Sequence, residues 1–290
     1  NKYQNTRTLE HENTSSPMQT YNLPPIPQLR HILKSVWIVD YGKIGGQERM
    51  IPFGCMDMVY VERGELFYKN GILKSFTQQD IFLTGQVSKP YDFIYGPNAC
   101  ILGFGFYPHT AHLFTKIASH QLTNSINLLS DLFEENYSWG KLNSSISLKE
   151  KANLLQQFIL QQVERNRIST PKQEYLRFLL NGIFQSEGAF NLSKAQSELQ
   201  ISPRYIQRLF KEYVGINPLL YARIVRFLHT IDKYEPSRDC ITVLALDCGY
   251  YDQSHFIRDF KAFTGLTPRQ YFQQPPNLTE QFTQNEAGSL

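Results

Sequence analysis

Cysteine is scarce in this sequence, and a long apolar run is missing. The 290 residues contain four cysteines, which are too few and too scattered for a disulfide framework. No apolar stretch approaches the ~20 residues of a membrane-spanning helix. Residues 1–21 are polar and lack the apolar core of a signal peptide. We therefore expect a cytoplasmic chain with no membrane partner.

An excess of charge of either sign is also missing. The formal net charge is +3, and residues 188–274 carry 11 basic and 8 acidic side chains. Any DNA binding in that region must therefore depend on where the basic side chains lie rather than on their number. The length predicts two domains, each able to form a core without disulfides or metals.

The pattern of apolar residues changes near Pro108. Before it, short apolar and aromatic runs alternate with turn signals, including the hairpin pair Asn70-Gly71, and they predict a small β barrel or sandwich. After it, the apolar residues follow a helical period, most clearly from Leu148 to Val163. This helix could pack on the β domain or pair with its copy in a homodimer, and the sequence leaves both open. The predicted segments are a flexible tail over 1–22, a β-rich domain over 23–165, a linker over 166–171, a helical domain over 172–274 and a second tail over 275–290.

A repeat lies in the helical part. Residues 202–221 and 252–271 align at an offset of 50 with six identical positions among twenty, where about one is expected by chance. A repeat at fixed spacing indicates one supersecondary unit built twice. The identical pairs are Arg208/Arg258, Phe210/Phe260, Lys211/Lys261, Gly215/Gly265, Pro218/Pro268 and Tyr221/Tyr271.

Each copy has the signals of a capped helix after a short helix and a tight turn. Ser202 and Asp252 are expected N-caps, and Gly215 and Gly265 stand where the helices should end. Short helices are expected before them at residues 192–199 and 243–248, and residues 218–234 form a connecting helix. This order is the helix-turn-helix pattern. The outward stripes are Arg204, Gln207, Arg208 and Lys211 in the first copy and Ser254, Ile257, Arg258 and Lys261 in the second.

The region from about Lys172 to Phe272 resembles the DNA-binding domain of AraC/XylS-type transcriptional regulators. The residues that carry the resemblance are Ser202-Pro203-Arg204-Tyr205-x-Gln207-Arg208-x-Phe210-Lys211, then Ala245-x-x-Cys248-Gly249-Tyr250-x-Asp252-Gln253-Ser254-His255-Phe256-x-Arg258-x-Phe260-Lys261, and Thr264-Gly265-x-Thr267-Pro268-x-x-Tyr271. The resemblance implies a bacterial regulator, expected to be an activator. It also implies seven helices, with two recognition helices about one DNA turn (~34 Å) apart. Double-stranded promoter DNA and RNA polymerase are the implied partners.

The resemblance and the chemistry of the side chains together nominate the DNA-binding residues. Arginine can bind guanine and glutamine can bind adenine through paired hydrogen bonds, while lysine suits a phosphate. The expected base-reading residues are Arg204, Gln207, Arg208, Gln253, Ser254 and Arg258. Lys211 and Lys261 are expected at phosphates, and Ile257 at a thymine methyl group. His255 either contacts phosphate or makes a hydrogen bond within the domain.

The N-terminal region resembles the cupin-like domains of some of these regulators. The matching residues are Arg49-x-x-Pro52-x-Gly54-Cys55-Met56-Asp57-Met58-Val59 and Gly103-x-Gly105-Phe106-x-Pro108. The overall class is therefore α+β, with a cupin-like barrel or sandwich and flanking helices before an all-α domain of two helix-turn-helix units. In the family such domains bind a small-molecule effector, dimerise, or both. The candidates for fixing a polar ligand group are Arg49, Asp57 and Arg63.

Three other functions compete with that of an effector-controlled regulator. A cupin enzyme fused to a DNA-binding domain would need a metal site, but the chain has no His-x-His and only the pair His109 and His112, so we expect no metal, no cofactor and no catalysis. A DNA-repair regulator would need clustered cysteines, and Cys55 and Cys100 stand apart. A regulator without a ligand, whose N-terminal domain serves only dimerisation, stays as the alternative.

Overall fold

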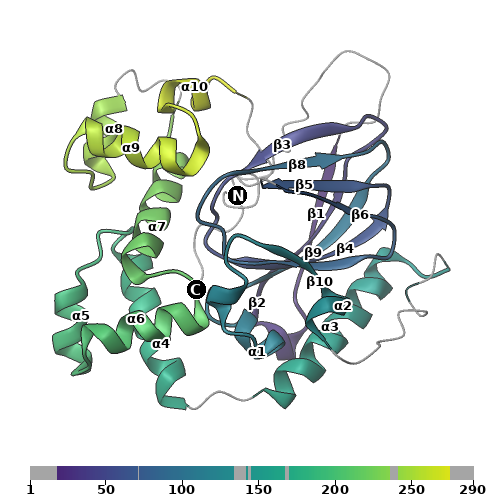
Figure 1. Ribbon diagram of the computed structural model, residues 1–290, viewed down its shortest axis with the longest axis horizontal. Helices are drawn as coiled ribbons and strands as arrows, with labels where there is room; N and C mark the ends of the chain where they lie inside the picture. The colour runs from purple at the N-terminus through teal and green to yellow at the C-terminus, as the bar shows by residue number, and fades with distance from the viewer. Residues whose placement is uncertain are drawn as a thin grey trace, which may run out of the picture.

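The computed structural model describes residues 18–70, 72–133, 142, 145–166, 170–235 and 241–274. It has a β-rich N-terminal part and an all-helical C-terminal part, as the sequence predicts (Figure 1). The strands are β1 Gln19–Leu23, β2 Leu33–Asp40, β3 Gly46–Met50, β4 Met56–Arg63, β5 Leu66–Asn70, β6 Ile72–Phe76, β7 Ile81–Thr84, β8 Tyr91–Tyr95, β9 Cys100–Phe106 and β10 Ile126–Leu128. The helices are α1 Ala111–Thr115, α2 Leu129–Leu132, α3 Leu148–Arg165, α4 Thr170–Gln185, α5 Leu192–Leu199, α6 Pro203–Tyr213, α7 Pro218–Lys233, α8 Ile241–Asp247, α9 Gln253–Thr264 and α10 Pro268–Phe272.

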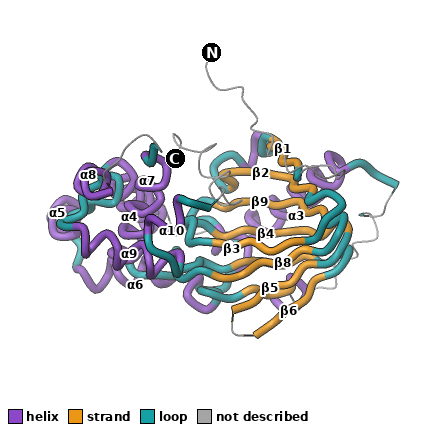
Figure 2. Tube along the Cα trace, turned by 90° about the horizontal axis from the view of Figure 1, so that it is seen from above, coloured by secondary structure: helices purple, strands orange, loops and turns teal. Residues whose placement is uncertain are grey.

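The strands form two antiparallel sheets. One has the order β1-β2-β9-β4-β7-β10, and the other has the order β3-β8-β5-β6. Figure 2 shows their strands running across the β domain, beside the helical domain. Residues Leu66–Asn70 and Ile72–Phe76 pair antiparallel on either side of position 71, as the Asn70-Gly71 signal predicts, although Gly71 itself lies outside the described residues.

The central strands of the large sheet are buried on both faces. From β4, Val59 and Val61 join the aromatic core between the sheets, while Met58 and Tyr60 join a second core on the other face, together with side chains of α1 and α3. A strand buried on both sides reads as a continuous apolar run rather than an alternating one. This is why residues 56–61 are apolar at every position except Asp57.

Helix α3 packs within the chain. Its stripe residues Leu155, Phe158 and Ile159 are buried in the core on the outer face of the large sheet, and the nearly buried ammonium of Lys151 lies 2.6 Å from a carboxylate oxygen of Glu62 on β4. Figure 1 shows α3 running along the sheet. Of the two partners that the sequence left open, the β domain is therefore the one that covers this face.

The prediction of a flexible tail over residues 1–22 is wrong at the C-terminal end of that segment. Residues 19–22 belong to β1, which pairs antiparallel with β2. The strand is polar and exposed, and it lies at the edge of the sheet. Because an edge strand can be held by backbone hydrogen bonds alone, its side chains give little signal of its structure. Residues 1–17, 167–169 and 275–290 lie outside the described residues, and they include most of the first predicted tail, half of the linker and all of the second tail.

The two domains meet at a contact that we call the domain seam, formed by residues 119–123 of the β domain and residues 213–215 of the helical domain. The hydroxyl of Ser119 donates to the carbonyl of Tyr213 at 2.9 Å, and the hydroxyl of Thr123 donates to the carbonyl of Gly215 at 2.9 Å. The β domain is therefore hydrogen-bonded to the helical domain at the C-terminal end of α6.

A second contact between the domains lies at the start of α7. The buried hydroxyl of Tyr221 donates to the carbonyl of Gly54 at 3.1 Å, and Ile51 of the β domain is fully buried in the core of the helical domain. A loop of the β domain thus contributes to the packing of the helical one.

Candidate nucleic-acid interface

Seven helices, α4 to α10, fill the described residues 170–235 and 241–274. Helix α5 precedes α6, and α8 precedes α9, so each pair forms one helix-turn-helix unit, with α6 and α9 as the recognition helices. Helix α7 connects the two units (Figure 1). The arrangement agrees with the repeat in the sequence.

The N-terminus of each recognition helix is capped as the sequence predicts. The Ser202 side chain accepts a hydrogen bond from the backbone N–H of Tyr205 at 3.2 Å. The Asp252 carboxylate accepts one from the N–H of His255 at 2.7 Å. Each cap satisfies a backbone donor that the helix leaves unpaired in its first turn.

Helix α6 has one buried face and one exposed face. Ile206, Leu209, Phe210 and Tyr213 are buried, and the exposed side chains are Arg204, Gln207, Arg208 and Lys211. A spacing of i, i+3, i+4 and i+7 keeps all four on one side of a helix. Three of them can read base edges, and the fourth can neutralise a phosphate.

Helix α9 presents a similar but less polar face. Phe256, Phe260 and Phe263 are buried, while the exposed candidates are Gln253, Ser254, Arg258 and Lys261. Ile257 departs from the expected outward placement, since it is half-buried and packs against the core of the helical domain. A contact between its remaining exposed surface and a thymine methyl group stays a prediction.

His255 turns toward its own domain. Its ring lies edge-on to Tyr250, with the ring centroids 5.2 Å apart, and its Nε2 is 3.9 Å from Oδ2 of Asp259. These neighbours favour the role within the domain over the phosphate contact, and they leave the phosphate contact as a prediction.

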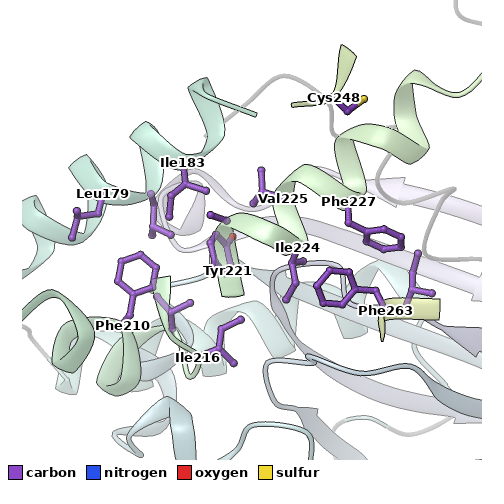
Figure 3. Packing of buried hydrophobic residues seen from close by; sticks show 14 of the residues in the cluster. Leu179, Ile183, Phe210, Ile216, Tyr221, Ile224, Val225, Phe227, Cys248 and Phe263 are labelled. Carbon is purple, nitrogen blue, oxygen red and sulfur yellow. The ribbon is translucent and has the colours of Figure 1, made fainter. Parts of the chain in front are cut away.

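One hydrophobic core holds the two units together. Figure 3 shows that Tyr221, Ile224, Val225 and Phe227 of α7 lie among side chains of both units, and that Phe227 points toward Phe263. The rings of Phe227 and Phe263 have centroids 5.1 Å apart. Because protein interiors are close-packed, a continuous core resists changes in the relative position of the recognition helices.

An ion pair between a partly exposed arginine and a buried carboxylate joins α7 to α9. The carboxylate of Asp259 is 1% exposed and lies 2.7 Å from the guanidinium of Arg223, whose Nε also bonds to it. This hydrogen bond raises the pKa of Arg223. A buried carboxylate is costly unless it is paired, so the pair restricts where α9 can sit on α7. Arg226 likewise braces the domain, since it donates to the carbonyl of Gly188 at 2.7 Å.

The sequence pattern did not identify Asp259 and Tyr205 as residues that support the recognition helices. The signal that could have identified Asp259 is the stronger of the two. Asp259 falls between Phe256 and Phe260 on the buried stripe of its helix, so a charged residue there points to a buried partner. Tyr205 lies beneath the guanidinium of Arg208, which is 4.9 Å from the ring centroid. An aromatic residue three positions before an arginine on a helix is a weaker signal, because many such pairs never stack.

The three candidates for a ligand group do not come together. Arg49 forms an ion pair with Asp92 at 3.0 Å on the small sheet. Arg63 pairs with Asp40, at the opposite end of β4 from Asp57. Both arginines are thus engaged with carboxylates, and a shared ligand site for the three residues has no support in the geometry.

The histidine pair lies close to the helical domain. Nδ1 of His112 is 2.9 Å from the carbonyl oxygen of Ile117, and its ring lies edge-on to Tyr213 with centroids 4.8 Å apart. Burial lowers the pKa of His109 to about 4. Across the described ranges, no group of three or more His, Cys, Asp or Glu side chains is placed to hold a metal ion. None of the helices described is long and apolar enough to span a bilayer.

Two families match parts of the chain. Residues 196–274 match a family described as a helix-turn-helix domain, HTH_18. Residues 21–127 match a family described as a domain of unknown function, DUF6597. The first match spans both recognition helices, and the second covers most of the β domain.

Similar proteins include transcriptional regulators. The HTH-type transcriptional activator RhaR of Yersinia pseudotuberculosis serotype O:3 (strain YPIII) is 30% identical over 105 residues, which are 36% of this chain and 36% of that protein. The RhaR activator of Salmonella dublin is 24% identical over 220 residues, which are 73% of this chain and 76% of that protein. A solved structure of ToxT from Vibrio cholerae superposes with a TM-score of 0.46 and 10% identity, covering 88% of this chain and 98% of ToxT.

The match over residues 196–274 begins within α5 and ends after α10, so it includes both capped recognition helices. The β domain has the two facing antiparallel sheets expected of a cupin-like fold. The chain therefore combines a helix-turn-helix domain in its C-terminal part with an N-terminal β domain that matches a family of unknown function.

Proposed function

We propose that this protein is a sequence-specific DNA-binding transcriptional regulator that acts as an activator. The observation that carries the proposal is the pair of capped recognition helices, whose exposed arginine and lysine recur at equivalent positions of the repeat, as Arg208/Arg258 and Lys211/Lys261. One core and one connecting helix hold them together. The related RhaR proteins are named transcriptional activators, which supports the direction of the effect.

Each recognition helix has its own set of contacts in this proposal. In α6, Arg204 and Arg208 bind guanines and Gln207 binds an adenine in one major-groove segment, since these side chains match the donor and acceptor pattern of those bases. In α9, Arg258, Gln253 and Ser254 read the next segment. Lys211 and Lys261 bind phosphates on the flanks of the two segments.

The cupin-like domain serves regulation in this proposal. Its role is to bind a small-molecule effector, to form a homodimer, or both, and the effect reaches the first unit through the domain seam. RNA polymerase is the expected partner on the promoter. The alternative is a regulator without a ligand, in which the domain only dimerises. The described histidine, cysteine and carboxylate side chains form no metal-binding group, so they give no support to the alternative of a metal-dependent cupin enzyme.

The test is a selection of random duplex DNA by the full chain at ~150 mM salt, followed by sequencing. We expect a motif of two blocks centred about 10 base pairs apart, and a doubled motif if the protein is a dimer. Arg208→Ala should lose the preference at one base pair of one block, and Arg258→Ala at one base pair of the other. Each loss should amount to roughly 1–3 kcal/mol on the cognate site.

Lys149→Ala is the matched control, because Lys149 is an exposed residue of α3 in the other domain and its removal also lowers the charge by one. It should bind the selected site like the parent chain. If both arginine variants also bind like the parent, the assignment of the recognition faces is wrong. If no sequence is enriched, with or without added cell extract as a source of effector, the proposed function fails.

A further inference from the structure

The two recognition helices differ in how they hold their central arginine. In α6, the guanidinium carbon of Arg208 lies 4.9 Å from the ring centroid of Tyr205, one turn earlier on the helix. The ring of Tyr205 is half-buried and meets the ring of Tyr175 on α4 edge-on, with centroids 6.1 Å apart and planes at 90°. The ring of Tyr205 therefore contacts both Tyr175 of α4 and the guanidinium of Arg208.

The second unit lacks this support. At the repeat offset of 50, His255 occupies the position of Tyr205 and Arg258 that of Arg208. His255 contacts Tyr250 and approaches Asp259, so its ring faces the interior. Within the described part of the chain, the side chain of exposed Arg258 has no ion pair and no aromatic ring beneath it. The arginine of the second helix is thus free to sample its rotamers.

We propose that Tyr205 is a positioning residue, which preorganises Arg208 so that the first recognition helix demands its guanine more strictly than the second. This inference rests on the proposed DNA-binding function. A guanidinium that lies over an aromatic ring engages its face and leaves the N–H donors along its edge free. Those donors are the ones that bind O6 and N7 of guanine.

The physical reason is conformational entropy. An arginine side chain has many rotamers, and a free arginine loses them only when it binds. The stacked arginine of α6 has already lost part of this freedom in the absence of DNA. An exposed cation–π contact is weak, so the expected benefit is a factor of about two to five in affinity for the correct base.

The test uses the full chain and two DNA duplexes, which are the selected site and a site in which the guanine assigned to Arg208 is replaced. That guanine is the one whose preference disappears in Arg208→Ala. Tyr205→Leu should bind the selected site about two- to fivefold more weakly than the parent chain does. It should bind the replaced site as the parent does. Tyr205→Phe keeps the ring and should restore the parent affinity.

A double-mutant cycle shows whether the effect of Tyr205 passes through Arg208. In an Arg208→Ala background, Tyr205→Leu should have no further effect on the selected site. In an Arg258→Ala background, the same change should keep its full effect, because that arginine is on the other recognition helix. Tyr175→Leu, which removes the ring behind Tyr205, should reduce the affinity in the same direction.

The results that would contradict the proposed role of Tyr205 can be told apart from those that would contradict the proposed function. An equal loss on both duplexes, or a loss that persists in the Arg208→Ala background, would show that Tyr205 supports the fold or contacts DNA itself, and a lowered melting temperature would separate these two. If Tyr205→Leu binds the selected site with the parent affinity while Arg208→Ala binds it more weakly, this inference is wrong and the proposed function still stands. Parent-like binding by both Arg208→Ala and Arg258→Ala would instead overturn the recognition faces.

Discussion

Replacing Gly215 by alanine should disturb the domain seam, whereas the same change at Gly265 should not. The two glycines occupy equivalent positions of the repeat, and both have the left-handed backbone that favours glycine, with φ of +97° and +76°. Their neighbours differ. A Cβ atom on Gly215 would lie 2.7 Å from the hydroxyl oxygen of Thr123 and 3.0 Å from the carbonyl oxygen of Ser119, while one on Gly265 would approach only the terminal nitrogen of Arg49, at 3.0 Å.

The loss of stability expected for Gly215→Ala has two parts. One part is shared with Gly265→Ala, and the other is specific to Gly215. An alanine in the left-handed region costs about 1–2 kcal/mol relative to glycine, and this applies to both variants. At Gly265 the flexible end of Arg49 can move away at little cost. At Gly215 a hydroxyl and a backbone carbonyl must move, which weakens the two hydrogen bonds of the seam, each contributing about 0.5–1.5 kcal/mol. We therefore expect Gly215→Ala to cost about 1–3 kcal/mol more than Gly265→Ala.

Thermal unfolding of the full chain measures the difference, and amide hydrogen exchange locates it. Since 1 kcal/mol shifts the midpoint by roughly 2–4 °C in domains of 150–250 residues, the two midpoints should be clearly separated. Exchange at residues 119–125 should accelerate in Gly215→Ala only. Combining Gly215→Ala with Thr123→Ala should cost less than the sum of the two single changes, because the shorter side chain removes the 2.7 Å contact.

Equal midpoints for the two glycine variants would refute the reasoning. So would unchanged exchange at residues 119–125, or strictly additive effects of the pair. Each of these would mean that the seam gives way without cost and does not restrain the first recognition helix.

Four further outcomes are expected. Arg223→Ala should destabilise the chain by about 2–3 kcal/mol in denaturant unfolding, below the range for a fully buried pair because Arg223 is partly exposed, and Arg223→Lys should lose less, since it keeps a charge beside Asp259; equal losses would argue against the ion pair. Asp252→Ala should cost about 1 kcal/mol through the lost cap, so an unaltered melting temperature would count against that role. Lys211→Ala should weaken binding to all sequences and make the slope of log affinity against log salt shallower by about one, whereas an unchanged slope would remove it from the phosphate contacts. His109 has a lowered pKa of about 4 against about 6.5 in the unfolded chain, so its neutral form stabilises the fold above pH 6.5 and this stability is lost as the pH falls toward 4, by up to about 3 kcal/mol; His109→Gln should flatten that part of the stability profile.

Local signals accounted for most of the helical domain. The N-caps Ser202 and Asp252, the glycine ends and the apolar stripes act within one or two helical turns, so they can be read without knowledge of the rest of the chain. The expected helices at 192–199 and 218–234 agree with α5 and α7 to within one residue. The exposed faces of α6 and α9 were also predictable, apart from Ile257, because a helix that buries one stripe exposes the other.

Signals in the β domain were weaker. Strands β3 and β8 lie far apart in the sequence and pair with each other in the small sheet. Strand β10 follows α1 in the chain, in the region where the apolar pattern predicts helices. A short strand is stabilised by the strand beside it, which is remote in sequence. The hairpin at Asn70-Gly71 is the exception, since its turn residues mark the pairing locally.

The sequence by itself determined two capped recognition helices, their polar faces and their equivalence, because capping and periodicity are local properties of the chain. Only the tertiary structure decided which surface covers α3, that Asp259 pairs with Arg223, that Tyr205 supports Arg208 and that Gly215 touches the other domain. Each of these depends on the distance and orientation between elements far apart in sequence, or on which rotamer a side chain adopts. Those quantities are set by the packing of the whole core, so residue identity alone leaves them open.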